Sequence, residues 1–88
     1  MTATITVYTQ PSCGPCAATK RHLDKAEVAY ETIDIRESPL AATLLRERGF
    51  TGTPVVIGKV GDREYAWQDY RSADLDALIY LVKEGDAA

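Results

Sequence analysis

The order of apolar and polar residues divides the chain into short segments with two different periods. Segments 4–8, 30–35, 55–57 and 63–67 are rich in β-branched and aromatic residues or alternate between apolar and polar positions, as strands do. Three other segments repeat their apolar residues every three or four positions, as helices do when one face is buried. The expected order of elements is therefore β-α-β-α-β-β-α.

Each expected helix has a recognisable beginning. Pro15 and Pro39 suit the first turn of a helix, where the missing N–H of proline does no harm, and Ser38 and Ser72 suit the capping position. Gly85 is expected to end the third helix. The faces expected to be buried consist of Cys16, Thr19, Leu23 and Ala26 in the first helix, Leu40, Ala41, Leu44 and Leu45 in the second, and Leu75, Leu78, Ile79 and Val82 in the third.

The connections between the segments determine the expected fold class. A strand–helix–strand unit joins parallel strands through a right-handed crossover. A short turn at 58–62 instead joins the last two strands in antiparallel pairing. We therefore expect an α/β fold with a four-stranded mixed sheet flanked by three helices. The 88 residues suit one domain over 1–88.

Composition and charge exclude several classes of function. The apolar fraction of 45% and the charged fraction of 26% are typical of a soluble globular protein. A net charge of −3 argues against nucleic-acid binding, which needs a basic face. No apolar run approaches the ~20 residues of a membrane span, and the N-terminus lacks the pattern of a secretory signal. We expect a cytoplasmic monomer.

The most distinctive chemistry is the run Cys13-Gly14-Pro15-Cys16 at the start of the first expected helix. Two cysteines at this spacing are close enough to form a disulfide, and the helix N-terminus favours a thiolate at Cys13. Because the thiolate is the attacking species, we expect Cys13 to be the nucleophile and Cys16, on the buried face, to be the resolving cysteine. We expect Gly14 to let the turn close while leaving Cys13 accessible, and Pro15 to stiffen the loop.

Two structural interpretations of this cysteine pair stay open beside the redox one. Cys-x-x-Cys is also half of a zinc site, but a structural zinc takes four ligands. Beyond the two cysteines the sequence offers only His22, which we expect to be exposed and not catalytic. A purely structural disulfide would be unusual in a cytoplasmic chain and would close a very short loop. The sequence therefore favours redox chemistry, although it places no acid beside Cys16 to accept a proton.

Over essentially its whole length the chain resembles the thioredoxin-fold redoxins. The run at 13–16 matches the thioredoxin active-site sequence, whereas the length and the short distance from the first strand to that run are similar to a glutaredoxin. Thr53-Pro54 matches the position at which this superfamily carries a cis-proline facing the disulfide. On the residues alone, a cis bond and an ordinary trans proline before a strand both stay open. The resemblance favours the cis bond.

Within this superfamily, the chain resembles the glutaredoxin-like NrdH-redoxins more than the parent groups. The similarity includes the runs 8–9, 18–20 and 49–50, and the group's late signature Trp-Ser-Gly-Phe-Arg-Pro, which stands here at 67–72. In that signature Trp67, Tyr70 and Arg71 agree, whereas Gln68, Asp69 and Ser72 differ. The resemblance implies that substrates or partners bind at Gln10, Thr53, Pro54, Trp67, Asp69, Tyr70 and Arg71. Packing of the Trp67 ring on the sheet is an equal alternative.

The resemblance also implies partners. It implies no bound cofactor, electrons from NADPH through a flavin-containing thioredoxin reductase, and delivery to the large subunit of ribonucleotide reductase. Gln10 stands where many glutathione-using glutaredoxins have a cation, whereas Asp69 is an acid suited to the glutathione amino group. Two other functions therefore stay open: a glutaredoxin-type reductase that uses glutathione or another low-molecular-weight thiol, and a metal- or cluster-binding module.

Overall fold

The computed structural model describes the backbone of residues 3–87 and the side chains of residues 3–84, and its elements follow the predicted order. These are β1 (Ala3–Thr9), α1 (Gly14–Lys25), β2 (Glu31–Asp34), α2 (Pro39–Glu47), β3 (Val55–Val60), β4 (Arg63–Gln68) and α3 (Ser72–Ala87). Every predicted element is present, with ends that differ by up to a few residues.

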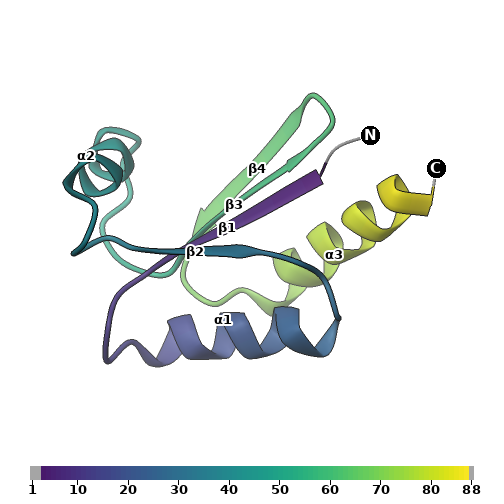
Figure 1. The fold of residues 1–88 in the computed structure, drawn as a ribbon, viewed down its shortest axis with the longest axis horizontal. Coiled ribbons are helices and arrows are strands. Elements are labelled where there is room, and N and C mark those ends of the chain that lie inside the picture. Colours follow the sequence, from purple (N-terminus) through teal and green to yellow (C-terminus); the bar gives the residue numbers. More distant parts are fainter. Residues whose placement is uncertain (1–2, 88) are drawn as a thin grey trace.

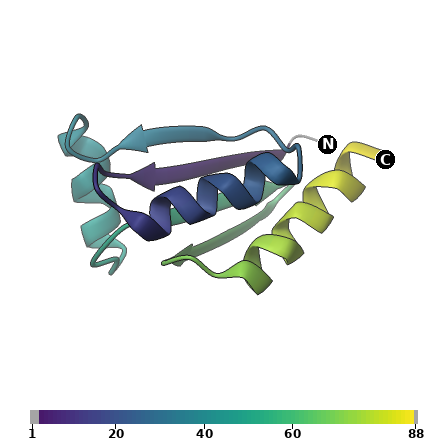
Figure 2. The same cartoon turned by 90° about the horizontal axis from the view of Figure 1, so that it is seen from below.

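The four strands form one mixed sheet in the order β2-β1-β3-β4. Strand β1 is parallel to β2 and antiparallel to β3, and β3 is antiparallel to β4, as predicted. Helices α1 and α3 lie along one face of the sheet, whereas α2 lies at one end of the sheet on the opposite side (Figure 1 and Figure 2). This arrangement confirms the predicted fold class.

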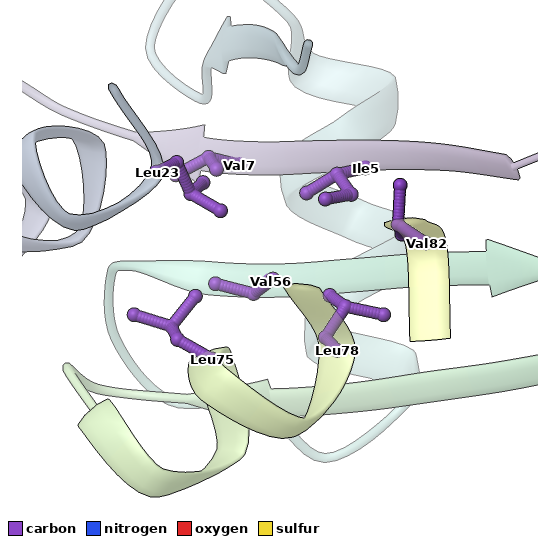
Figure 3. Packing of buried hydrophobic residues seen from close by; sticks show 7 residues of the cluster. All are labelled: Ile5, Val7, Leu23, Val56, Leu75, Leu78 and Val82. Atoms are coloured by element: carbon purple, nitrogen blue, oxygen red, sulfur yellow. The ribbon is translucent and has the colours of Figure 1, made fainter. Parts of the chain in front are cut away.

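The core lies between the sheet and the pair of helices α1 and α3. Its buried cluster takes side chains from β1 and β3, one leucine from α1, and three residues from α3, which point toward one another in Figure 3. The spacing of apolar residues in the first and third helices therefore predicted most of their buried faces, although Ala26 follows α1 and, like Ile79, is only partly buried. The cluster consists of Ile5, Val7, Leu23, Val56, Leu75, Leu78 and Val82.

Helix α2 is covered less than its pattern predicts. Ser38 caps it by accepting a hydrogen bond from the backbone N–H of Ala41 at 3.3 Å, and Ala41 and Leu45 are buried. The prediction that Leu40 and Leu44 share this buried face is wrong, since these residues are 73% and 50% exposed. The reason is the position of α2 at the end of the sheet, where only one narrow side of the helix meets other parts of the chain.

The turn between β3 and β4 is shorter than predicted, because Gly61 and Asp62 alone connect the paired strands. Gly61 has a φ of +61°, which suits the first central position of a tight hairpin turn. Gly58, which the sequence places in the turn, instead lies inside β3. A Cβ atom at this position would lie 2.7 Å from both δ-carbons of Leu78 on α3. The glycine therefore permits the helix to approach the sheet closely.

Helix α3 differs from its prediction at both ends. Its first residue is Ser72, and the carbonyl of Arg71 accepts a hydrogen bond from the N–H of Leu75 at 2.9 Å, so Arg71 stands at the position predicted for the serine cap. The helix also continues through Gly85 to Ala87, so the prediction that Gly85 ends it is wrong. Over residues 3–87, none of the helices is both long enough and apolar enough to cross a membrane.

Candidate redox site at the start of helix α1

The two cysteines lie at the beginning of α1, where they form a disulfide. Cys13 is the capping residue: its Sγ accepts a hydrogen bond from the backbone N–H of Cys16 at 3.1 Å, and its carbonyl accepts one from Ala17 at 3.2 Å. Pro15 occupies the first turn, as its missing N–H predicts. The two Cα atoms are 5.2 Å apart, a usual separation for a disulfide. The helix start itself therefore brings the two sulfur atoms together.

The same geometry makes the two cysteines unequal. Cys16 is 1% exposed, whereas Cys13 is half-buried and therefore less accessible than the sequence predicts. The helix dipole and the N–H donated by Cys16 favour negative charge on the Cys13 sulfur after reduction of the disulfide. An approaching sulfur atom can thus reach Cys13 more easily than Cys16.

The two residues between the cysteines are exposed and leave this approach open. Gly14 has no positive φ, and a Cβ atom built on it would meet nothing within 4 Å. The predicted need for glycine to close the turn is therefore not found, although the open space in front of Gly14 fits the accessibility predicted for Cys13. Pro15 is likewise exposed at the helix start.

The loop before β3 faces the disulfide. The Thr53–Pro54 bond is cis, as the resemblance implied. The Thr53 hydroxyl lies 3.7 Å from the Cys13 sulfur and can donate a hydrogen bond to it, and the Thr53 carbonyl oxygen lies at the same distance. Pro54 is buried. Thr53 therefore contacts the sulfur atom that we expect to react.

Two residues at the end of β4 hold this loop in place. The side chain of Gln68 accepts a hydrogen bond from the backbone N–H of Thr51 at 3.0 Å and donates one to the Thr51 hydroxyl at 3.2 Å. The backbone N–H of Asp69 donates to the Pro54 carbonyl at 2.8 Å. In the sequence Gln68 stands out only as a departure from a signature, because its partner lies 17 residues away.

Trp67, on β4, and Arg71, at the start of α3, line the same groove. Trp67 is half-buried and packs against the core cluster, and its indole Nε1 is the one buried side-chain polar atom without a hydrogen-bond partner among the described residues. Trp67, Arg71 and Asp74 line a groove of about 400 Å³ between β4 and α3. An exposed ion pair joins Arg71 to Asp74 at 3.7 Å. The packing interpretation of Trp67 therefore holds, and its role toward a partner stays a prediction.

Tyr70 contacts α1 through a residue that we expected to be exposed and unpaired. His22 is only 19% exposed in its side chain and forms hydrogen bonds to the Tyr70 hydroxyl at 2.9 Å and to Asp76 at 2.7 Å. The expectation of a solvated His22 is wrong because α3 and the residues before it pack beside α1, an arrangement that local spacing does not reveal. Gln10 is exposed in the connection between β1 and α1.

Among the residues that the structure describes, no acidic side chain is buried near Cys16. Thr19 is the single buried polar side chain among the described residues, and its hydroxyl donates to the Pro15 carbonyl at 2.9 Å. Burial, with a hydrogen bond to Asp24 and the negative charge of Asp24, raises the pKa of Tyr30 to about 12, but this pair lies toward the far end of α1 from the disulfide. Within the part of the chain that the structure describes, no three His, Cys, Asp or Glu residues gather as a metal site would require.

Comparisons of sequence identify a family and relatives of this chain. A model of the glutaredoxin family matches residues 5–62, which include both cysteines and the cis-proline loop. The glutaredoxin-like protein NrdH of Escherichia coli (strain K12) is 40% identical over 74 residues, which cover 84% of this chain and 86% of that protein. The protein of the same name from Lactococcus lactis subsp. lactis (strain IL1403) is 30% identical over 74 residues, which cover 84% and 97% of the two chains.

Comparisons of structure lead to the same group. The glutaredoxin-like NrdH-redoxin from Escherichia coli, which is described as having a thioredoxin-like activity profile, matches with a TM-score of 0.75 and 36% identity over 84% of this chain and 92% of that one. The thioredoxin-like protein BC3987 matches with a TM-score of 0.70 and 33% identity, over 84% and 97% of the two chains.

Proposed function

Because the chain belongs to the glutaredoxin-like NrdH-redoxins of the glutaredoxin family, we propose that it carries electrons from thioredoxin reductase to ribonucleotide reductase. Its reaction class is thiol–disulfide exchange by a Cys-x-x-Cys oxidoreductase. NADPH supplies the electrons through the flavin of the reductase, and the large subunit of ribonucleotide reductase receives them. As part of the same proposal, the protein acts as a monomer in the cytoplasm, where thiols are kept reduced.

The proposed cycle uses both cysteines and transfers two electrons. The Cys13 thiolate attacks one sulfur of the substrate disulfide, forms a mixed disulfide and releases the first substrate thiolate, which takes up a proton. The Cys16 thiolate then attacks the Cys13 sulfur, which releases the second substrate thiol and leaves the Cys13–Cys16 disulfide. Two electrons from the reductase restore the dithiol. No buried acid serves Cys16 among the described residues, so solvent or the departing substrate thiolate accepts its proton.

The observation that carries the proposal is the unequal placement of the two sulfur atoms. Cys13 caps α1, is partly accessible and accepts the N–H of Cys16, whereas Cys16 is buried directly behind it. A structural disulfide would have no need of an accessible sulfur with a stabilised thiolate. The arrangement suits a nucleophile followed by a resolving cysteine.

The choice of thioredoxin reductase over glutathione rests on one side chain and on one relative. Gln10, three residues before Cys13, is neutral and exposed, so it offers no positive charge to a glutathione carboxylate. The related NrdH-redoxin of Escherichia coli is described as thioredoxin-like in activity. Both support a protein partner as the source of electrons.

The test measures NADPH oxidation with thioredoxin reductase and insulin, and then with the large subunit of ribonucleotide reductase as the disulfide substrate. We expect turnover in both assays and none with Cys13→Ser. A parallel assay supplies glutathione, glutathione reductase and a small mixed disulfide. Turnover in the glutathione assay alone would refute the proposal.

A glutathione-dependent reductase is the second candidate, because Asp69 is exposed directly beside the cis-proline loop. Its N–H is bonded to the Pro54 carbonyl, and its exposed carboxylate carries the charge that would pair with a glutathione amino group. Asp69→Asn separates the two functions. A selective loss of the glutathione-coupled rate would support this candidate, and unchanged rates in both assays would remove it.

A metal- or cluster-binding function is a third possibility with less support. The described residues bring no further ligands to the cysteine pair, and a zinc site needs four. Retention of a metal after purification, without activity in either assay, is the result that would favour it.

A further inference from the structure

We propose that His22 is a positioning residue, which holds Tyr70 and thereby fixes the β4–α3 connection (residues 69–71) where a protein partner needs it. The inference rests on the proposed function, because it takes this connection to belong to the surface that a reductase or client protein contacts. Neither the redox chemistry of Cys13 nor that of Cys16 requires a histidine on α1. His22 nevertheless has partners for both of its ring nitrogens.

The contacts of His22 join three separate parts of the chain. Its Nδ1 lies 2.9 Å from the Tyr70 hydroxyl, and its Nε2 lies 2.7 Å from the Oδ1 of Asp76 on α3. The rings of His22 and Tyr70 also meet edge to face, with centroids 5.8 Å apart and planes at 61°. When Nε2–H donates to Asp76, the Nδ1 of the neutral ring accepts the hydrogen of the Tyr70 hydroxyl.

Differences in exposure show what each contact contributes. The Asp76 side chain is 71% exposed, and a hydrogen bond to so accessible a carboxylate adds little stability. Its effect is to orient the histidine ring and to select the tautomer that accepts from Tyr70. Tyr70 is 41% exposed, and together with His22 and Asp76 it lines a groove of about 660 Å³ between α1 and α3. One edge of the tyrosine ring is therefore held, while the rest is free to meet a partner.

The β4–α3 connection is held at two points. Asp69 has a φ of +76°, in the left-handed region that is uncommon outside glycine but that aspartate tolerates better than most residues. The Asp69 N–H donates a hydrogen bond to the Pro54 carbonyl. Thr53, the residue before Pro54, contacts the Cys13 sulfur through its hydroxyl. His22 provides the second attachment, from the helix that begins at the disulfide. Both attachments therefore place the connection relative to the reacting sulfur.

The test is a double-mutant cycle with the full chain. His22→Ala and Tyr70→Phe each remove the hydrogen bond, and we expect each to raise the KM measured with thioredoxin reductase about three- to tenfold, with kcat unchanged. The double variant should raise KM no further than either single variant, because both remove one shared contact. Lys83→Ala, on the exposed surface of α3, is the matched control and should leave KM unchanged. His22→Gln, which keeps a donor and an acceptor, should restore part of the loss.

A second measurement does not depend on any partner. Trp67 is the only tryptophan and lies three residues before Tyr70, so acrylamide quenching of its fluorescence reports on this segment. We expect stronger quenching in His22→Ala and Tyr70→Phe, and no change in the control. If wild type fails to turn over with thioredoxin reductase, the proposed function fails, and the quenching series alone decides the positional role of His22. Unchanged KM and quenching in both single variants, or effects that multiply in the double variant, would overturn the inference.

Discussion

Replacement of Gly58 by alanine tests how closely α3 approaches the sheet. The new Cβ would lie 2.7 Å from both δ-carbons of Leu78 and 3.2 Å from its γ-carbon. Leu78 is 2% exposed and belongs to the core cluster, so it cannot move aside freely. Overpacking of this kind costs about 1–3 kcal/mol, and the lower backbone entropy of alanine offsets about 0.5–1 kcal/mol.

We therefore expect Gly58→Ala to lower the free energy of unfolding by about 1–2 kcal/mol, which for a domain of this size lowers Tm by roughly 4–16 °C. The assay is reversible unfolding of the oxidised protein in urea and by heat, followed by circular dichroism. Gly52→Ala is the control, because the nearest atom to its Cβ would lie 3.9 Å away, an ordinary contact. It should change stability by less than about 0.5 kcal/mol.

The Leu78→Ala background supplies the decisive comparison. Truncation of Leu78 costs about 2–5 kcal/mol by itself, but it also removes the atoms that collide with the new Cβ. In that background Gly58→Ala should stabilise the protein by up to about 1 kcal/mol. If Leu78→Ala does not fold, Leu78→Val, which lacks the δ-carbons, replaces it. The reasoning is wrong if Gly58→Ala is neutral in wild type, or if its sign does not change with the shorter residue 78.

Three further predictions concern the site and the charge state of the protein. Cys13→Ser should abolish turnover. Cys16→Ser should accumulate a mixed disulfide between Cys13 and the protein substrate, which intact-mass measurement detects. Full activity of Cys16→Ser would contradict the two-cysteine cycle. Thr53→Val should slow alkylation of reduced Cys13 by iodoacetamide at neutral pH about three- to tenfold, because the thiolate loses a hydrogen-bond donor; an unchanged rate would show that the 3.7 Å contact contributes nothing. Burial and Asp24 raise the pKa of Tyr30 to about 12, so the folded protein favours the neutral phenol. The resulting stability is fully present below pH ~10 and is lost as the pH rises through about 12. Unfolding titrations of Tyr30→Phe should therefore show a smaller loss over this window than wild type, and equal losses would contradict the assignment.

Features that depend on neighbouring residues could be predicted from the sequence. Pro15, Pro39 and Ser38 mark helix starts because a cap and a first turn involve only residues a few positions apart. The different roles of Cys13 as nucleophile and Cys16 as resolving cysteine could be predicted for the same reason, because they depend on positions three residues apart in one helical turn. The cis bond before Pro54 came from the resemblance and not from the residues, because proline permits both isomers.

Features that depend on distant contacts could not be predicted. Gly58 reads as a turn residue until the packing of Leu78, twenty positions later, shows why a side chain is excluded. His22 resembles any histidine among charges, because its partners lie 48 and 54 residues further along the chain. The partial burial of an amphipathic helix is equally hidden, since periodicity predicts a face but not how much of it the sheet covers. This is why the contacts of His22 and Gly58 could not be predicted, whereas the disulfide between neighbouring residues could.

The double role of Cys13 has a practical consequence for capturing partners. The Cys13 sulfur that caps α1 has a lone pair that can accept the Cys16 N–H in each of its three states: the thiolate, the mixed disulfide and the intramolecular disulfide. The capping hydrogen bond can therefore persist through a turnover without a change in the helix start. Serine is a strong capping residue in its own right. Cys13→Ser should thus remove the chemistry and leave the first turn intact, whereas Cys13→Ala removes both. The Cys13→Ser variant is therefore the better redox-inactive variant for measuring how tightly the reduced form binds its partners.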